Sequence, residues 1–160
     1  MLRVFKPLPV ANEVHSAAAL PAAARAYAHD TVTLGWEERM KARALRRSEA
    51  GLEFGTSLPR GTILRQDDIF VLDVVATRIS VVERDEPVLV IEPATDEEWA
   101  RFAYHIGNSH QPMMVADGRI VCPDVAGMAQ VLEYHRIPFT RAQRPFTPIG
   151  HVPDHRHQQS

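Results

Sequence analysis

The sequence predicts an α+β protein with a small all-β domain, then a ferredoxin-like βαββαβ domain, and a mobile C-terminal tail. Three observations lead to this prediction. Short β-like runs divided by turn residues fill residues 31–91. After residue 92, two segments with helical spacing alternate with further strand-like runs. From Gly150 the chain carries histidines among polar residues and proline, a composition too polar to pack. We therefore expect domains at residues 1–92 and 93–149 and a flexible tail at 150–160.

The first half is expected to be a small antiparallel sandwich or open barrel. Residues 31–34, 69–72, 78–82 and 87–91 are β-branched or alternating runs with no convincing helix between them. Residues 1–30 form an extension of poorly defined structure. Within it, the alanine-rich stretch 16–28 is compatible with a short helix, with Pro21 near its first turn.

The second half starts with a strong helix signal. Thr95-Asp-Glu-Glu98 is a capping box, and a buried stripe with i, i+3, i+4, i+7 spacing follows it before Gly107-Asn108 ends the helix. The stripe consists of Trp99, Phe102, Ala103 and Ile106.

A hairpin and a second helix follow. Asp117-Gly118 lies between apolar runs in residues 112–121, which favours a tight β-hairpin turn. The next helix is expected to begin near Pro123 or Asp124 and to end around residues 135–136. Residues 139–146 supply a last strand, and 87–91 supply the first, which gives the order βαββαβ. The second helical stripe consists of Val125, Met128, Ala129 and Leu132.

Composition excludes several functional classes. Eighteen basic and twenty acidic residues give a formal charge of −2, so we expect no nucleic-acid partner. The sequence has neither a signal-peptide pattern nor an apolar run of about 18 residues, so we expect a cytoplasmic protein with no membrane partner. Its single cysteine, Cys122, excludes an intramolecular disulfide.

Histidines are the main chemical signal. Six of the eight lie in the second half, and imidazole suits nickel, zinc and copper better than hard cations. His105 and His110 are five residues apart, about 140° around a helix, so they cannot chelate one ion from a common face. We expect His105 to be packed as a structural residue. His110 follows the end of the helix, on an exposed connection from which its side chain can reach a metal.

The segment Tyr104-His-Ile-Gly-Asn-Ser-His110 resembles the His-Leu-Gly-Asn-Arg-His motif of the UreE family, the urease accessory proteins that carry nickel for assembly of the urease active site. The resemblance extends over residues 31–150. It also rests on Leu58-Pro-Arg-Gly-Thr62, Glu86-Pro-Val-Leu89 and Arg144-Pro-Phe146. It implies that His110 is the central metal ligand, and that two copies meet at a head-to-head dimer interface between ferredoxin-like domains.

Further ligands follow from the same resemblance. The tail histidines His151, His155 and His157 are expected to complete the metal shell. Cys122 and Asp124 stand where many relatives carry a His-x-His pair, and both are competent donors. We favour the alternative for this pair, in which Cys122 packs in the core and Asp124 caps the second helix.

The function implied is that of a nickel metallochaperone that is not an enzyme, since no nucleophile elbow, phosphate-cradling loop or His-Glu-x-x-His motif is present. The expected partners are a second copy, the urease apoprotein and other urease accessory proteins such as the GTPase. Arg39, Lys41 and Arg43 would line one face of a strand in the partner-binding first domain, where they could dock an acidic surface or simply be solvated. Two alternatives remain open: a non-enzymatic protein adaptor, and a zinc or copper buffer.

Overall fold

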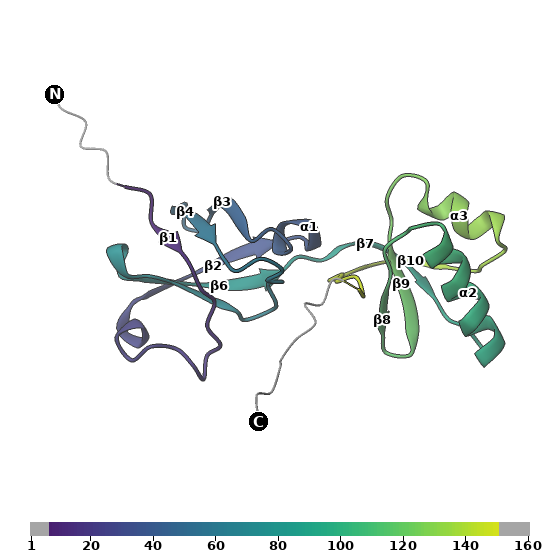
Figure 1. The fold of residues 1–160 in the computed structure, drawn as a ribbon, viewed down its shortest axis with the longest axis horizontal. Helices are drawn as coiled ribbons and strands as arrows, with labels where there is room; N and C mark the ends of the chain where they lie inside the picture. Colours follow the sequence, from purple (N-terminus) through teal and green to yellow (C-terminus); the bar gives the residue numbers. More distant parts are fainter. Residues whose placement is uncertain (1–6, 151–160) are drawn as a thin grey trace. The chain divides into compact units, whose positions relative to one another are not determined.

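The computed structural model describes residues 7–150, which form two compact units that divide between Glu83 and Arg84 (Figure 1). Each unit has its own hydrophobic core and is described separately below. The tail histidines His151, His155 and His157 lie outside the described residues. Within residues 7–150, no helix is both long enough and apolar enough to span a membrane.

Unit 1 is built from two three-stranded sheets. One sheet has the order β1 (Val10–Ala11), β4 (Glu53–Ser57), β3 (Arg43–Arg47), and the other has the order β2 (Ala28–Leu34), β6 (Thr77–Glu83), β5 (Ile69–Leu72). Short helical turns are η1 (Ala23–Ala26), α1 (Trp36–Arg39) and η2 (Asp73–Val75). Residues from both sheets share one core, in which the rings of Phe54 and Phe70 lie 5.6 Å apart.

One expectation for unit 1 was wrong. β1 pairs with β4 and β2 with β6 in parallel, so the unit is not purely antiparallel. The reason is that a long segment, which includes β3 and β4 of the other sheet, separates β2 from β6 and returns the chain to the same end of the sheet. The alanine-rich stretch contains the short helix η1 directly after Pro21, where Leu20 and Ala24 are buried against Ile69 before the chain extends into β2.

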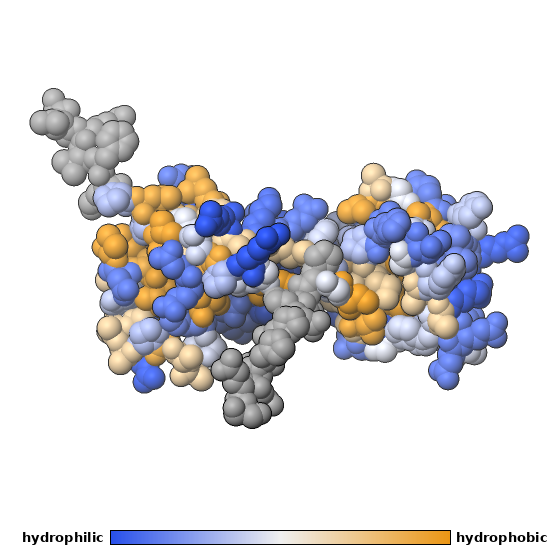
Figure 2. Space-filling view, in the orientation of Figure 1, coloured by the Kyte–Doolittle hydropathy of each residue, from blue (hydrophilic) through white to orange (hydrophobic). Residues whose placement is uncertain are grey.

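The surface of unit 1 carries an apolar patch. Figure 2 shows hydrophobic residues over β1 and β4, where Leu8 and Val10 are about half exposed. Val74 and Val75 of η2 are exposed as well, and together these segments line a groove of about 490 Å³. The polar residues of unit 1 gather instead over β3 and α1 in the same view.

Unit 2 has the predicted ferredoxin-like topology. Its sheet has the order β10 (Thr140–Arg144), β7 (Glu86–Ile91), β9 (Arg119–Pro123), β8 (Met114–Ala116), with every neighbouring pair antiparallel. The helices α2 (Asp96–Asn108) and α3 (Met128–Tyr134) cover one face, to which alternate residues of β7 and β9 point (Figure 1). The core on that face contains Leu89, Ile91, Phe102, Ile106, Ile120, Cys122, Met128, Leu132 and Ile137.

Local signals explain how unit 2 forms. Thr95 caps α2 by accepting a bond from the backbone N–H of Glu98 at 3.1 Å. Asp117 and Gly118 have φ of 52° and 70°, the left-handed pair that the predicted tight turn requires. α3, however, begins at Met128 and not at 123–124, because Pro123 still belongs to β9 and Gly127 precedes the helix with a φ of 87°.

Candidate metal site

The C-terminal end of α2 places His110. The N–H of His110 donates to the carbonyl of Gly107 at 3.0 Å, and the N–H of Gln111 donates to the carbonyl of Ile106 at 3.3 Å. These two bonds form a Schellman motif, in which the residue after the helix adopts a left-handed conformation. That residue is His110, with a φ of 54°. Gly107 and Asn108, expected to end the helix, are both inside it.

Histidine is an unusual residue at this position, which normally favours glycine or asparagine. A side chain with a Cβ in the left-handed region costs about 1–2 kcal/mol. His110 is nevertheless exposed, so packing does not explain its presence. Arg136 takes the same left-handed conformation at the end of α3, in a motif with the same two hydrogen bonds. The motif also fixes the direction in which the imidazole leaves the backbone.

His105 is packed, as predicted. Its ring stacks on the ring of His135, with centroids 4.0 Å apart and planes inclined by 16°. Desolvation lowers the pKa of His105, and the neighbouring charges of His135 and Arg101 lower it further. Stacked rings hold their nitrogen lone pairs in nearly parallel planes, so this pair does not converge on one ion. Sequence analysis missed His135 because it lies at the end of α3, far along the chain from α2.

Cys122 lies in the core of unit 2, with none of its surface exposed. Burial raises the pKa of its thiol to about 12, so the thiolate that binds metals is strongly disfavoured at neutral pH. This geometry agrees with the packing role that we favoured.

The capping role expected for Asp124 was wrong, because Gly127 precedes α3 and no side chain caps it. The carboxylate of Asp124 instead accepts a bond from Nε of Arg141 at 3.1 Å. Asp124 also continues from β9, its N–H donating to the carbonyl of Pro87 at 2.9 Å. A salt bridge across the sheet therefore holds this carboxylate.

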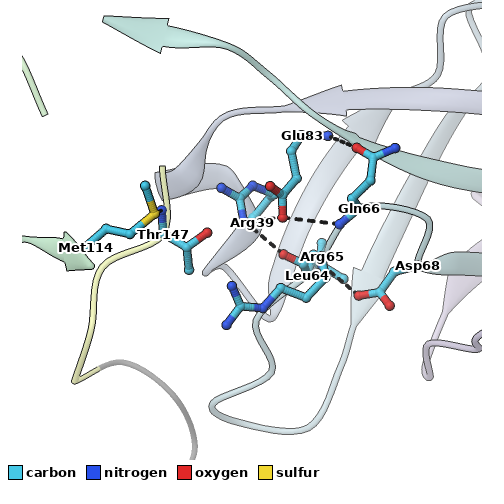
Figure 3. A network of polar contacts seen from close by, with 8 residues as sticks. All are labelled: Arg39, Leu64, Arg65, Gln66, Asp68, Glu83, Met114 and Thr147. Atoms are coloured by element: carbon cyan, nitrogen blue, oxygen red, sulfur yellow. Dashed lines mark hydrogen bonds and ion pairs between the residues drawn. The ribbon is translucent and has the colours of Figure 1, made fainter. Parts of the chain in front are cut away.

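The basic row predicted on one strand does not exist. Arg39 lies in α1 and is fully buried, and only Arg43 belongs to β3. The Nη1 group of Arg39 donates to the carbonyl of Leu64 at 3.1 Å and to Oε1 of Glu83 at 3.2 Å (Figure 3). The sequence resembled a strand here, but the chain turns into a short helix directly after β2.

Comparison with known proteins matches both units to one family. The N-terminal domain of the UreE urease accessory protein matches residues 11–81, and the C-terminal domain of that protein matches residues 86–160. This chain belongs to the UreE family.

Relatives support the assignment over most of the chain. The urease accessory protein UreE of Burkholderia vietnamiensis is 32% identical over 87% of this chain and 66% of its own length. Those of Paracidovorax citrulli and Albidiferax ferrireducens are 32% and 30% identical, over 59% and 78% of their lengths. The chain therefore spans less than two thirds of several of the UreE proteins that it matches.

In this UreE family member, residues 7–150 contain no group of three or more His, Cys, Asp or Glu side chains arranged to hold a metal ion. Among the candidate ligands within residues 7–150, His110 is the one that is exposed and lies directly after a helix end. One imidazole is an incomplete site, so any tight site needs ligands from elsewhere.

Proposed function

We propose that this protein binds nickel through His110 and donates it during assembly of the urease active site, without catalysing a reaction itself. Membership of the UreE family supports the urease role. The observation that carries the assignment to His110 is its exposed, left-handed position at the end of α2. Because the side chain is exposed there, the imidazole is accessible to a metal ion.

The ligand shell is proposed to form between two copies. In an isologous dimer each residue near the twofold axis meets its own copy, so two His110 side chains can share one ion. His151, His155 and His157 are proposed to add further ligands from the tail. Cys122 and Asp124 are less suited, because the thiol is buried and protonated and the carboxylate is bonded to Arg141.

The acceptors of the metal are proposed to be the urease apoprotein and other urease accessory proteins such as the GTPase. A shell made of several separate imidazoles suits transfer, because its ligands can be exchanged one at a time. The same imidazoles would hold zinc or copper in vitro. Competition between the three ions, measured by elemental analysis of the protein after dialysis, separates a nickel donor from a zinc or copper buffer.

Nickel titration calorimetry tests the site. His110→Ala should remove the tightest site, whereas deletion of residues 151–160 should weaken binding without abolishing it. Light scattering after size-exclusion chromatography should give a dimer of the parent, with or without nickel. Normal binding by His110→Ala together with loss of binding in the tail deletion would assign the metal to the tail. No binding of any metal by the parent would leave the adaptor alternative.

A further inference from the structure

The two sheets of unit 1 leave a cleft between their edge strands. β2 is at the edge of one sheet and β3 at the edge of the other. The cleft between them has a volume of about 280 Å³, near the lower limit for small-ligand pockets. It is therefore wide enough for one or two side chains and too small for a helix. Its lining residues belong to β2, β3 and the α1 turn, and they include Leu34, Glu38, Lys41, Ala44, Arg46 and Arg47.

The β3 side of the cleft offers free backbone groups. Hydrogen bonds between Leu58 and Ala42 and between Ser48 and Leu52 continue the β3–β4 ladder at both ends. In an antiparallel pair, alternate residues of a strand direct both backbone groups toward the same neighbouring strand. The N–H and C=O groups of the even-numbered residues of β3 therefore face β4. The N–H and C=O groups of the odd-numbered residues face away from it, and in the described chain β3 pairs with β4 alone. Leu45, at the centre of this edge, is 70% exposed.

The β2 side is already occupied. The N–H of Glu49 donates to the carbonyl of Thr31 at 2.8 Å. The carboxylate of Glu49 accepts from the N–H of Thr33 at 3.3 Å. Glu49 thus binds two of the outward backbone groups on this stretch of β2, and the carboxylate of Asp30 accepts from a third, the N–H of Thr31, at 2.7 Å. An added strand would find its hydrogen-bonding partners on β3.

A buried cation lies beside the cleft. Arg46 is 6% exposed, and its guanidinium donates to the carbonyls of Glu38 at 3.2 Å and Lys41 at 2.8 Å and to the Thr56 hydroxyl at 3.2 Å. Burial lowers the pKa of Arg46, although an arginine stays charged at neutral pH. All three acceptors are neutral oxygens, and the nearby carboxylate of Glu38 favours the charged form of the guanidinium.

The rim adds to this positive charge. Lys41 and Arg47 line the cleft, and Arg43 is exposed on the same edge strand. The carboxylate of Glu38, which also lines the cleft, is held by the N–H of Gly35 at 2.9 Å. The cleft and its rim therefore have an excess of positive charge, in the polar region that Figure 2 shows over β3 and α1.

We propose that the cleft between β2 and β3 binds an extended, acidic segment of a partner protein. The segment adds as a strand to the free edge of β3 and places its carboxylates on the face that carries Arg43 and Arg47, while Arg46 adds positive charge from the opposite face. Backbone pairing supplies affinity in this mode of recognition, and the charges select an acidic sequence. The proposal concerns unit 1 alone and does not depend on the nickel site assigned to His110.

Fluorescence anisotropy with the full chain tests the proposal. The probe is a fluorescein-labelled octapeptide of alternating glutamate and valine. It should bind saturably and more weakly as salt rises, and the matching lysine and valine peptide should not bind. N-methylation of alternate backbone nitrogens on one edge of the probe should weaken binding at least about tenfold, because it removes the donors needed for strand addition.

Charge-reversal variants locate the site. Arg43→Glu combined with Arg47→Glu should weaken probe binding at least about tenfold. Arg25→Glu combined with Arg60→Glu makes the same charge change at two other exposed positions of unit 1 and should have little effect. Leu45→Glu is a single change at an exposed position of the same edge. It should also weaken probe binding, and it tests the site if the double variant does not fold.

Two results would overturn the proposal: equal binding of the N-methylated and unmodified probes, or equal loss of binding in the β3 and control variants. No binding of the acidic probe by the parent would do the same. Nickel titrations of the β3 variants should match the parent. This control keeps a failure in unit 1 distinct from a failure of the proposed metal site.

Discussion

Replacement of His110 by glycine should strengthen the end of α2 and should remove the proposed metal ligand. The left-handed φ of 54° costs a histidine about 1–2 kcal/mol, and glycine adopts it without that cost. Glycine loses about 0.5–1 kcal/mol through the greater entropy of its unfolded chain. The difference leaves a net gain of about 0.5–1 kcal/mol. Alanine keeps the unfavourable φ, so His110→Ala should have nearly the stability of the parent.

Urea denaturation measures this difference if unit 2 is observed alone. Trp99 of α2 packs against the core of unit 2, and Trp36 belongs to unit 1. In a Trp36→Phe background, Trp99 fluorescence therefore reports unit 2. With a urea m-value of about 2 kcal/mol/M, the glycine variant should unfold at a midpoint about 0.3–0.5 M above that of the alanine variant. Calorimetric titration with nickel should show the tight site missing from both.

The two measurements can refute different parts of the reasoning. Equal midpoints for the glycine and alanine variants would mean that the left-handed conformation does not limit the stability of this helix end. Nickel binding by the glycine variant with the affinity of the parent would show that the His110 imidazole is not a ligand. A more stable glycine variant that no longer binds nickel would support both the strain and the metal role.

Four further outcomes are expected. Glu83→Gln should destabilise unit 1 by about 3 kcal/mol in urea denaturation, because it removes the carboxylate that pairs with the fully buried Arg39. The stability of unit 2 should fall as pH drops below about 6.5, since the unfolded state then binds a proton that the lowered pKa of His105 excludes from the folded state. His105→Gln should reduce that fall in denaturation curves measured from pH 7 to 5. Nickel affinity, followed by calorimetry, should decrease over the same range because imidazole coordinates only when neutral. Cys122 should react with a thiol reagent at pH 8 only after unfolding, since burial holds its pKa at about 12.

Local patterns determined the order of elements in unit 2. The capping box at Thr95, the apolar stripe through Phe102 and Ile106, and the Asp117-Gly118 turn act over a few residues. Their physical effect does not depend on distant parts of the chain, so the sequence alone was sufficient to predict βαββαβ. The contiguous motif His105-Ile-Gly-Asn-Ser-His110 likewise identified His110 as the candidate ligand, because a contiguous motif can be recognised without knowledge of the fold.

Tertiary structure decided which charged and aromatic residues are buried or paired and which remain free to bind a ligand or a partner. Arg39 is buried because Glu83 lies beside it, although the two are 44 positions apart. Asp124 bonds to Arg141, 17 positions away, and does not cap α3. Stacking of His105 on His135 and the parallel pairing of β2 with β6 also join distant segments. Periodicity shows which face of an element is apolar, but not which residue another element will bring against it. Contacts of this kind exist only once the chain has folded, so the roles of these residues could not be predicted from the sequence alone.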